Sequence, residues 1–294
     1  MTAVNNAQPL THVRASLVQM DVEVLQPERN LARVMAAIKN EVEKGVDLIV
    51  FPELVNTGYI EPLTIGALHS TPVGEKGYAY ALYQAAEAPC GNYTRALCEQ
   101  ARLHGLHIVI GLAMQHPLIE GALYNSSVLI GPQGMLGVYN KIHRWHMEKM
   151  YFIAGDALPV FSTPFGRMGM QVCYDIRFPE VTRAFALQGA GLVTNIWASL
   201  AETDKPPVSE EIFVHRAYTR ATENGVFVLS CNRVGTQGHC HFLGQSIIVA
   251  PNGNVLARAS SDQEQVIRAH LELSQVAEYR SYTGIFSDRR EDIY

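Results

Sequence analysis

The chain has 294 residues, of which 48% are hydrophobic, and a formal net charge of −5, from 23 Lys and Arg against 28 Asp and Glu. This length fits one large α/β domain or two small ones. No apolar run approaches the roughly 18 residues of a membrane span, no basic block marks a nucleic-acid surface, and no secretory signal pattern opens the chain. We therefore expect a small-molecule substrate, with no nucleic-acid and no membrane partner.

The first half of the chain alternates between strand and helix patterns. Residues 1–12 are polar and unpatterned, which is typical of a loose arm. The region from Thr57 to Cys90 is less regular and suits a loop and a helix over a site. Apolar periodicity predicts strands at 13–20, 47–53, 107–113, 123–130 and 135–139, and helices at 27–44 and 91–104.

The second half continues the alternation and then closes with strands. The patterns predict helices at 180–187 and 209–222, and strands at 160–163, 168–172, 192–196, 226–231, 242–250, 255–259 and 266–271. Because strands and helices alternate without a Gly-, Ser- or Pro-rich linker, we expect an α/β layered domain over residues 13–275. Residues 276–294 are predicted to form a C-terminal arm.

The five cysteines are Cys90, Cys98, Cys173, Cys231 and Cys240. Their number is odd and no pair has C-x-x-C spacing, so a disulfide framework is not indicated. A reducing cytoplasm is the expected compartment.

Three predicted strands end in polar groups that complement one another. Glu53 follows one strand, Lys141 the second and Cys173 the third. In open α/β sheets, ligands bind beyond the carboxyl ends of the strands. A carboxylate, an ammonium and a thiol are therefore expected to meet at one site.

Cys173 is predicted to lie at a strand-to-helix junction. Pro179 suits the first turn of the following helix, and backbone N–H groups at a helix start favour an anion. This position favours a thiolate. Taken alone, the segment fits a buried structural cysteine better, because free cysteine is among the most buried residue types.

Together these residues resemble the carbon-nitrogen hydrolase (nitrilase) superfamily, and the likeness extends from about residue 13 to the last residue. The matching segments, in order, are Phe51-Pro52-Glu53, Lys141-x-His143, Glu148-Lys149-x-Tyr151-Phe152-x-x-Gly155-Asp156, Val172-Cys173-Tyr174-Asp175, Arg177-Phe178-Pro179-Glu180, Arg220-Ala221-x-Glu223-Asn224, Gly244-x-Ser246, Pro251-x-Gly253 and Asp288-Arg289-Arg290-x-Asp292-x-Tyr294. The resemblance implies a four-layer αββα sandwich with two similar halves. It also implies a homodimer or higher homo-oligomer, with the C-terminal arm packed against a neighbouring subunit.

The chemistry of the site follows from the residue types. Cys173 divides amide hydrolysis into two easier steps through a thioester, and Glu53 serves as the base that a neutral thiol requires. Lys141 and the backbone N–H of Tyr174 are the expected donors to the oxyanion. The resemblance implies that Glu148, a second glutamate, orients the substrate and holds the lysine.

Further side chains are candidates for the surroundings of the site. Tyr59 and Trp197 are expected to line the pocket, and His143 to hydrogen-bond near the active-site loop. Arg177 either fixes the cysteine turn or reaches a substrate carboxylate. Arg220 and Glu223 are three residues apart on a helix and are expected to pair.

Two histidine clusters allow a metal-binding interpretation. His143 and His146 form a His-x-x-His pair, and His239, Cys240 and His241 are consecutive. Neither set has complete tetrahedral ligand spacing, and thiol chemistry of this type requires no metal. We expect no metal and no cofactor.

The sequence thus predicts a cysteine-dependent amidase that converts a small linear carboxamide to the acid and ammonia. An N-carbamoyl amino acid or amine amidohydrolase is one alternative, although Ile176 stands where such enzymes carry a second arginine. A nitrilase is another, although Tyr174-Asp175 replaces the tryptophan-glutamate that usually follows the cysteine there. A non-catalytic binding or regulatory protein on the same fold is the alternative from another class.

Overall fold

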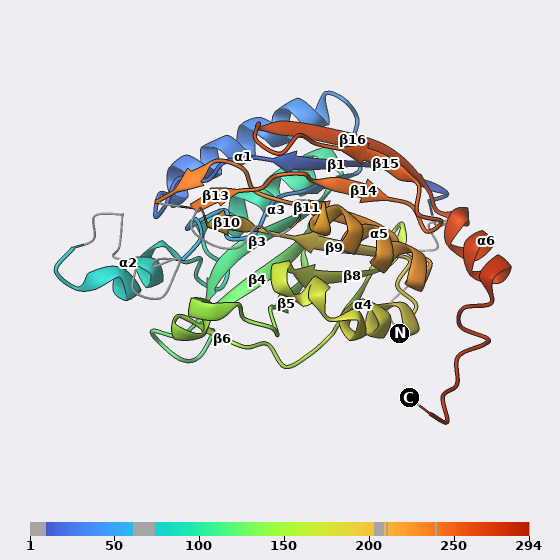
Figure 1. Ribbon diagram of the computed structural model, residues 1–294. Helices are drawn as coiled ribbons and strands as arrows, with labels where there is room; N and C mark the ends of the chain where they lie inside the picture. Colours follow the sequence, from blue (N-terminus) through green and yellow to red (C-terminus); the bar gives the residue numbers. More distant parts are fainter. Residues whose placement is uncertain (1–9, 61–73, 203–208, 210, 239, 294) are drawn as a thin grey trace, which may run out of the picture.

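The computed structural model describes residues 10–60, 74–202, 209, 211–238 and 240–293. Two large β-sheets lie face to face between two layers of helices (Figure 1). Most of the arm predicted at residues 1–12 lies outside the described residues, as do residues 61–73 of the irregular region. The first described strand begins at His12.

The first sheet has the strand order β16-β1-β2-β3-β4-β5, with β6 beside β4. Its strands are β1 (His12–Gln19), β2 (Leu48–Val50), β3 (His107–Gln115), β4 (Leu123–Gly131), β5 (Gly134–Asn140), β6 (Phe152–Ile153) and β16 (Gln265–Glu272). Strands β1, β2 and β3 are parallel, and β5 points the same way because β4 is antiparallel to both β3 and β5. The segments that follow β2 and β5 therefore leave from the same edge of this sheet.

The second sheet has the order β15-β14-β11-β9-β8-β7. Its strands are β7 (Val160–Thr163), β8 (Gly166–Val172), β9 (Leu192–Ile196), β11 (Phe227–Cys231), β14 (Ile247–Val249) and β15 (Val255–Arg258); β10 (Leu200–Glu202), β12 (Thr236–Gln237) and β13 (Cys240–Phe242) form a small third sheet. Strands β8, β9 and β11 are parallel. Their carboxyl ends therefore share one edge, and β8 leads directly into Cys173.

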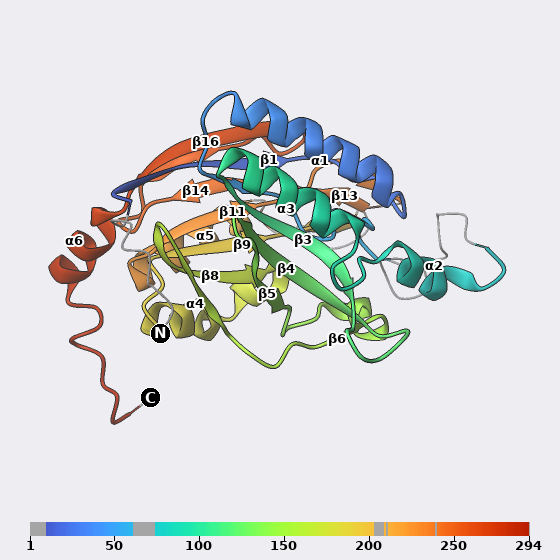
Figure 2. The same cartoon turned by 180° about the vertical axis from the view of Figure 1, so that it is seen from behind.

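Helices cover the outer face of each large sheet. The helices are α1 (Pro27–Val42), α2 (Gly77–Ala85), α3 (Asn92–His104), α4 (Pro179–Leu187), α5 (Ile212–Asn224) and α6 (Ser274–Thr283). Helices α1 and α3 lie on the first sheet, whereas α4 and α5 lie on the second (Figure 1 and Figure 2). The layers follow the order helix, sheet, sheet, helix, so the predicted αββα sandwich is confirmed.

The core explains why the central strands are continuous apolar runs. Leu17 and Val50 of the first sheet pack with Met170 and Val172 of the second in one buried cluster. Strands buried on both faces lack the polar alternation of a half-exposed strand. Helices α3 and α5 end at Gly105 and Gly225, whose positive φ angles of 67° and 55° suit glycine.

The strand predicted at 242–250 is wrong as a single element. Its first part belongs to β13 in the small sheet, and its later part forms β14 in the second large sheet. Gly244 separates them with a φ of 53°, and a Cβ there would lie 2.8 Å from two backbone oxygens. The glycine therefore allows the chain to change sheets.

Smaller differences concern the ends of elements. The helix predicted at 209–222 begins at Ile212 and extends to Asn224. Helix α6 was not predicted; it begins just before the expected arm, and the chain then leaves the body of the molecule (Figure 1).

In the part of the chain that the structure describes, no helix is long and apolar enough to span a membrane.

Candidate active site

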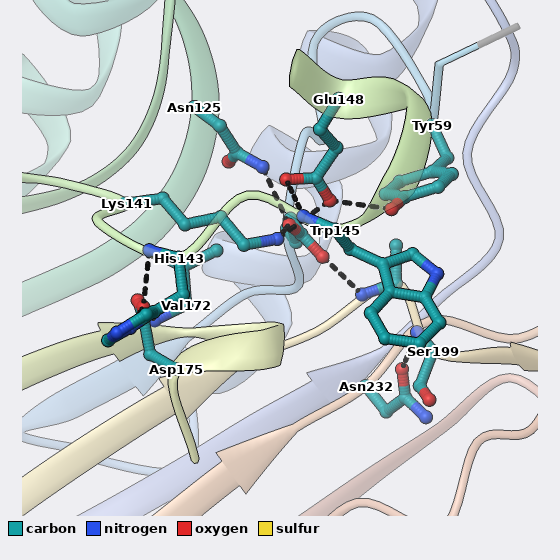
Figure 3. Close-up of polar contacts among 12 residues, drawn as sticks. Tyr59, Asn125, Lys141, His143, Trp145, Glu148, Val172, Asp175, Ser199 and Asn232 are labelled. Carbon is teal, nitrogen blue, oxygen red and sulfur yellow. Dashed lines mark hydrogen bonds and ion pairs between the residues drawn. The ribbon is translucent and has the colours of Figure 1, made fainter. Parts of the chain in front are cut away.

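Three candidate side chains, two from strand ends and one from a short turn, meet in the interior. The Lys141 Nζ lies 2.8 Å from the Glu53 Oε1 and 2.7 Å from the Glu148 Oε1, and all three side chains are fully buried. Figure 3 shows Lys141 reaching toward Glu148 from the segment after β5. We call Glu53, Lys141 and Glu148 the buried ion cluster.

Glu53 is held on both carboxylate oxygens. The Asn125 Nδ2 donates to Oε1 at 2.6 Å, and the backbone N–H of Ala198 donates to Oε2 at 2.7 Å. The Glu53 N–H itself donates to the Trp197 carbonyl at 3.3 Å. The carboxylate is therefore fixed between the two sheets, since Asn125 comes from β4 and Ala198 follows β9.

Glu148 is fixed by a separate set of donors. It lies in the short 3₁₀ turn η1 (His146–Met150), and its Oε2 accepts the Trp145 N–H at 3.2 Å. The Tyr59 hydroxyl donates to its Oε1 at 2.5 Å (Figure 3). The Tyr59 carbonyl in turn accepts the Gln237 side-chain N–H at 2.7 Å. Tyr59, which was expected to line the pocket, thus lies beside the site and hydrogen-bonds to Glu148.

Cys173 opens a 3₁₀ turn, η2 (Cys173–Arg177), directly after β8. Its φ of 49° is uncommon for a residue other than glycine and marks local strain, which clusters at functional sites. Glu53, Lys141 and Glu148 are the charged groups that act on its thiol. The thiol is therefore within electrostatic reach of the whole buried ion cluster.

The protonation of the site differs from the sequence-based expectation. Burial and the neighbouring Glu53 raise the pKa of the Cys173 thiol well above its usual range, although Lys141 opposes them. The expected thiolate is wrong, because burial and two carboxylates outweigh Lys141 and the start of a five-residue turn. The resting thiol is neutral and requires a base.

The pKa values of Glu148 and Lys141 are both raised, for different reasons. Burial raises the pKa of Glu148, and Lys141 only partly offsets this. Burial by itself would lower the pKa of Lys141, but a thiolate on Cys173 and the carboxylates of Glu148 and Glu53 raise it well above its usual range. Lys141 therefore stays a cation next to the thiol, whereas Glu148 holds a proton more readily than an exposed glutamate.

The cysteine turn is held by a buried carboxylate, Asp175. One oxygen accepts the Val172 N–H at 3.1 Å and the Tyr139 hydroxyl at 2.7 Å. The other accepts the His143 N–H at 3.0 Å and lies 2.9 Å from the His143 Nδ1 (Figure 3). The His143 ring also stacks on Phe178 at 3.6 Å. His143 thus supports the turn, as its expected place near the active-site loop implied.

Helix α5 also supports the cysteine turn. The Arg220 Nε donates to the Ile176 carbonyl at 3.0 Å, and its Nη2 donates to the Arg177 carbonyl at 3.3 Å. Arg220 also pairs with Glu223 at 2.9 Å, so the predicted helix pair is confirmed. Through these bonds, Arg220 holds the backbone of the cysteine turn against α5.

The remaining candidates lie around this centre. The Tyr174 ring is 4.6 Å from that of Trp145, and the Arg177 guanidinium lies 4.7 Å from the Trp145 ring centroid. The buried ring of Trp197 packs edge-on against Phe213, and its N–H donates to the Ser230 hydroxyl. Its backbone carbonyl accepts the Glu53 N–H, and its ring packs in one cluster with Ile176 of the cysteine turn.

Sequence reasoning missed Asn125 and Tyr139 as parts of the site. Asn125 follows Leu123-Tyr124 in a strand that becomes apolar only after Ser127, so a polar residue inside a buried strand was the available signal. Tyr139 is fully buried in β5 and could have been recognised only by its need for a hydroxyl partner.

The metal-binding interpretation finds no support among the described residues, where no three or more His, Cys, Asp or Glu side chains gather to hold an ion. His143 turns to Asp175, and the His146 ring stacks on Trp145. Cys240 is buried in β13, and His239 lies outside the described residues.

Comparisons with known proteins identify relatives over nearly the whole chain. The sequence profile of the carbon-nitrogen hydrolase family matches residues 14–281. The chain is 34% identical to a nitrilase from Pyrococcus abyssi, covering 96% of this chain and 99% of the relative. It is 31% identical to an omega-amidase from Xenopus tropicalis, covering 96% of both. A carbon-nitrogen hydrolase from Helicobacter pylori has the same fold, with a TM-score of 0.82 at 23% identity, over 96% of this chain and 97% of that one.

Proposed function

Because the chain belongs to the carbon-nitrogen hydrolase family and is an enzyme of amide hydrolysis, we propose that its substrate is a small linear carboxamide. The products are a carboxylic acid and ammonia, formed through a thioester on Cys173. The observation that carries the proposal is the fixed Glu53 carboxylate beside a thiol whose pKa is raised. Such a thiol reacts only when a base removes its proton.

The first half of the reaction forms the thioester. Glu53 takes the Cys173 proton as sulfur attacks the carboxamide carbon, and the carbonyl oxygen becomes an oxyanion. Lys141 and the Tyr174 backbone N–H are the proposed donors to that oxygen. Glu53 then passes its proton to the nitrogen, and ammonia leaves as the tetrahedral intermediate collapses.

The second half returns the enzyme to its starting state. Glu53 removes a proton from water, the hydroxide attacks the thioester carbon, and the carbon–sulfur bond breaks. The proton returns to sulfur, and the acid leaves. Glu148 does not transfer a proton in this scheme. Instead it positions Lys141, a role that its 2.7 Å contact with the ammonium supports.

An ammonia-release screen tests this proposal. Linear carboxamides, N-carbamoyl amino acids and aliphatic nitriles are compared at equal concentration, with the Cys173→Ala variant as the blank. We expect the carboxamides to have the highest kcat/KM. Faster release from the carbamoyl compounds or from the nitriles would assign the chain to that reaction instead.

We also propose that the enzyme acts as a homodimer or higher homo-oligomer in which the arm at residues 276–294 contacts a neighbouring subunit. Helix α6 has no buried residue within the described chain, which supports an outside partner for it. Light scattering of the full chain and of a chain ending at residue 275 tests this. A monomeric full chain, or an unchanged oligomer after truncation, would contradict it.

A further inference from the structure

Arg233 is a fully buried cation at one end of a chain of contacts that reaches the candidate site. Its side chain is 1% exposed, and its Nη2 lies 3.0 Å from the Oδ1 of Asp21, whose side chain is 41% exposed. Burial lowers the pKa of Arg233 to about 10, although Asp21 opposes this shift, so the guanidinium stays charged at neutral pH. A buried ion pair is weak evidence of a contribution to stability. The other contacts of this guanidinium therefore bear on its role.

Gln237 of β12 connects Arg233 to Tyr59. The Arg233 Nη1 donates to the Gln237 Oε1 at 2.8 Å, and the Gln237 Nε2 donates to the Tyr59 carbonyl at 2.7 Å. A guanidinium can only donate and a carbonyl can only accept, so a side chain that joins them must do both. The amide of Gln237 meets this requirement, and all three residues are buried.

Phe242 of β13 provides a second connection between the same two residues. The Arg233 guanidinium carbon lies 4.0 Å from the centroid of the Phe242 ring. The Tyr59 ring packs edge-on against that ring, with the two centroids 6.4 Å apart. Tyr59 is therefore fixed at its carbonyl by Gln237 and at its ring by Phe242, and both of these residues contact Arg233.

The position of the Tyr59 ring determines where its hydroxyl lies. That hydroxyl donates to the Glu148 Oε1 at 2.5 Å, and the same oxygen accepts a hydrogen bond from the Lys141 ammonium at 2.7 Å (Figure 3). A displaced ring would move one of the two donors that share this oxygen. Small misplacements of groups around the reacting atoms lower the rate of an enzyme strongly.

Resting on the proposed function, we infer that Arg233 and Gln237 are positioning residues of the hydrolysis reaction, acting through Tyr59. They hold its hydroxyl against Glu148, which in turn positions the Lys141 ammonium. Because the oxyanion that this ammonium stabilises forms only during the reaction, the loss of either residue lowers kcat and leaves KM nearly unchanged.

A double-mutant cycle tests the route through Tyr59. Gln237→Met has a side chain of similar length that can neither donate to the Tyr59 carbonyl nor accept from Arg233. The substrate is the compound with the fastest ammonia release in the screen, in which butanamide and succinamate represent the carboxamides. We expect kcat to fall about three- to tenfold, with KM within about twofold of the parent. In Tyr59→Phe, which has no hydroxyl to misplace, the same substitution should lower kcat less than about twofold.

Gln115→Met is the matched control. The Gln115 Nε2 donates to the Tyr83 carbonyl at 3.0 Å, which is the same type of bond at the end of β3. This variant should keep kcat within about twofold of the parent.

Arg233→Lys tests the other end of the connection. A lysine keeps a cation for Asp21 but lacks the planar fork that reaches Asp21 and Gln237 together. We expect a fall in kcat similar to that of Gln237→Met, and no further fall when the two substitutions are combined.

Circular dichroism and thermal unfolding verify the fold of each variant. If Gln237→Met is not folded, Gln237→Glu replaces it in the cycle, because a carboxylate keeps the contact with Arg233 but cannot donate to the Tyr59 carbonyl. The added charge acts equally in the Tyr59→Phe background, so the difference between the two backgrounds still reports the route through the hydroxyl.

The outcomes separate this inference from the proposed function. An equal fall in kcat in both Tyr59 backgrounds, a rise in KM with kcat unchanged, or an equal fall in Gln115→Met overturns the inference while the amidase proposal stands. Fastest release from a carbamoyl compound or a nitrile overturns the proposed substrate class, and the cycle on that compound still decides the inference. Release of ammonia from no compound overturns the proposed function and the inference with it.

Discussion

Two ionic clusters in this protein pair glutamate with lysine or arginine and behave in opposite ways. Glu41 on α1 has a buried side chain that binds Arg268 and Lys44, whose side chains remain 38% and 48% exposed. Burial by itself would raise the pKa of Glu41, but the hydrogen bonds and charges of the two cations lower it. In the buried ion cluster, burial prevails and raises the pKa of Glu148.

The two clusters differ in their exposure to solvent and in the number of cations for each carboxylate. The cations around Glu41 keep contact with water, and two of them serve one carboxylate. In the other cluster, one ammonium serves two carboxylates, and all three side chains are fully buried. Without water around it, the Glu148 carboxyl group takes up a proton more readily. The first arrangement fixes a helix to a strand, whereas the second is prepared for proton transfer.

The largest expected effect comes from removing the thiol that the buried ion cluster acts on. Cys173→Ala should lower ammonia release at least about 10⁴-fold, since no other group can form the thioester. Cys231→Ala is the control, because the buried Cys231 sulfur lies in the core and donates to the backbone carbonyls of Val18 and Val50. Circular dichroism and thermal unfolding verify the fold. Retained activity in Cys173→Ala would refute the assignment of the nucleophile.

The next effect compares the two clusters directly. Glu53→Gln keeps the size of the side chain but removes the base, so we expect kcat to fall about 10²- to 10⁴-fold. Glu41→Gln changes the same residue type in the other cluster and should leave kcat within about twofold of the parent. Steady-state ammonia release measures both. Equal losses in the two variants would remove the distinction between a proton-transfer cluster and a structural one.

A smaller effect tests the support of Glu148. Tyr59→Phe removes the hydroxyl that lies 2.5 Å from the Glu148 Oε1, and a hydrogen bond to a charged group is worth about 1.5–3 kcal/mol. We expect kcat to fall about tenfold and the unfolding temperature to fall by roughly a few degrees. Tyr80→Phe, at an exposed tyrosine of α2, is the control. An unchanged kcat in Tyr59→Phe would show that Glu148 needs no such support.

The smallest effect is on stability and carries a pH signature. The folded-state pKa of Glu41 is lowered, so its ionised form stabilises the fold at pH values above the unfolded pKa of about 4.3. This stabilisation is lost as the pH falls through the folded pKa. Glu41→Gln should therefore be less stable than the parent by roughly 1 kcal/mol at pH 7, and this gap should narrow when the pH is lowered to about 3. Denaturant unfolding at both pH values measures this gap, and a constant gap would contradict the lowered pKa.

Much of the fold was predictable, because the strands that form it are long apolar runs with clear ends. The strand at 192–196 was predicted with the bounds that the structure has, and α4 differs by one residue. The break at Gly244 was not predicted, since the apolar pattern continues on both sides and only tertiary pairing separates the two strands.

Within the site, the residues that could be predicted are those whose position follows from the order of the strands along the chain. Glu53, Lys141 and Cys173 each follow a strand, and parallel strands bring such positions to one edge. The role of Asn125 depends on β4 lying between β3 and β5, which local sequence does not encode. The pKa of Cys173 likewise depends on two carboxylates from distant segments, so its local junction suggested the wrong direction.

The central claim is that Glu53 activates Cys173 and then the water that releases the acyl group. Intact-protein mass spectrometry of Glu53→Gln after incubation with the best carboxamide, followed by peptide mapping, tests it most directly. The account predicts a mass increase equal to the acyl group, confined to the peptide that contains Cys173. An acyl group on another cysteine, or continued ammonia release with no adduct at any time, would contradict it.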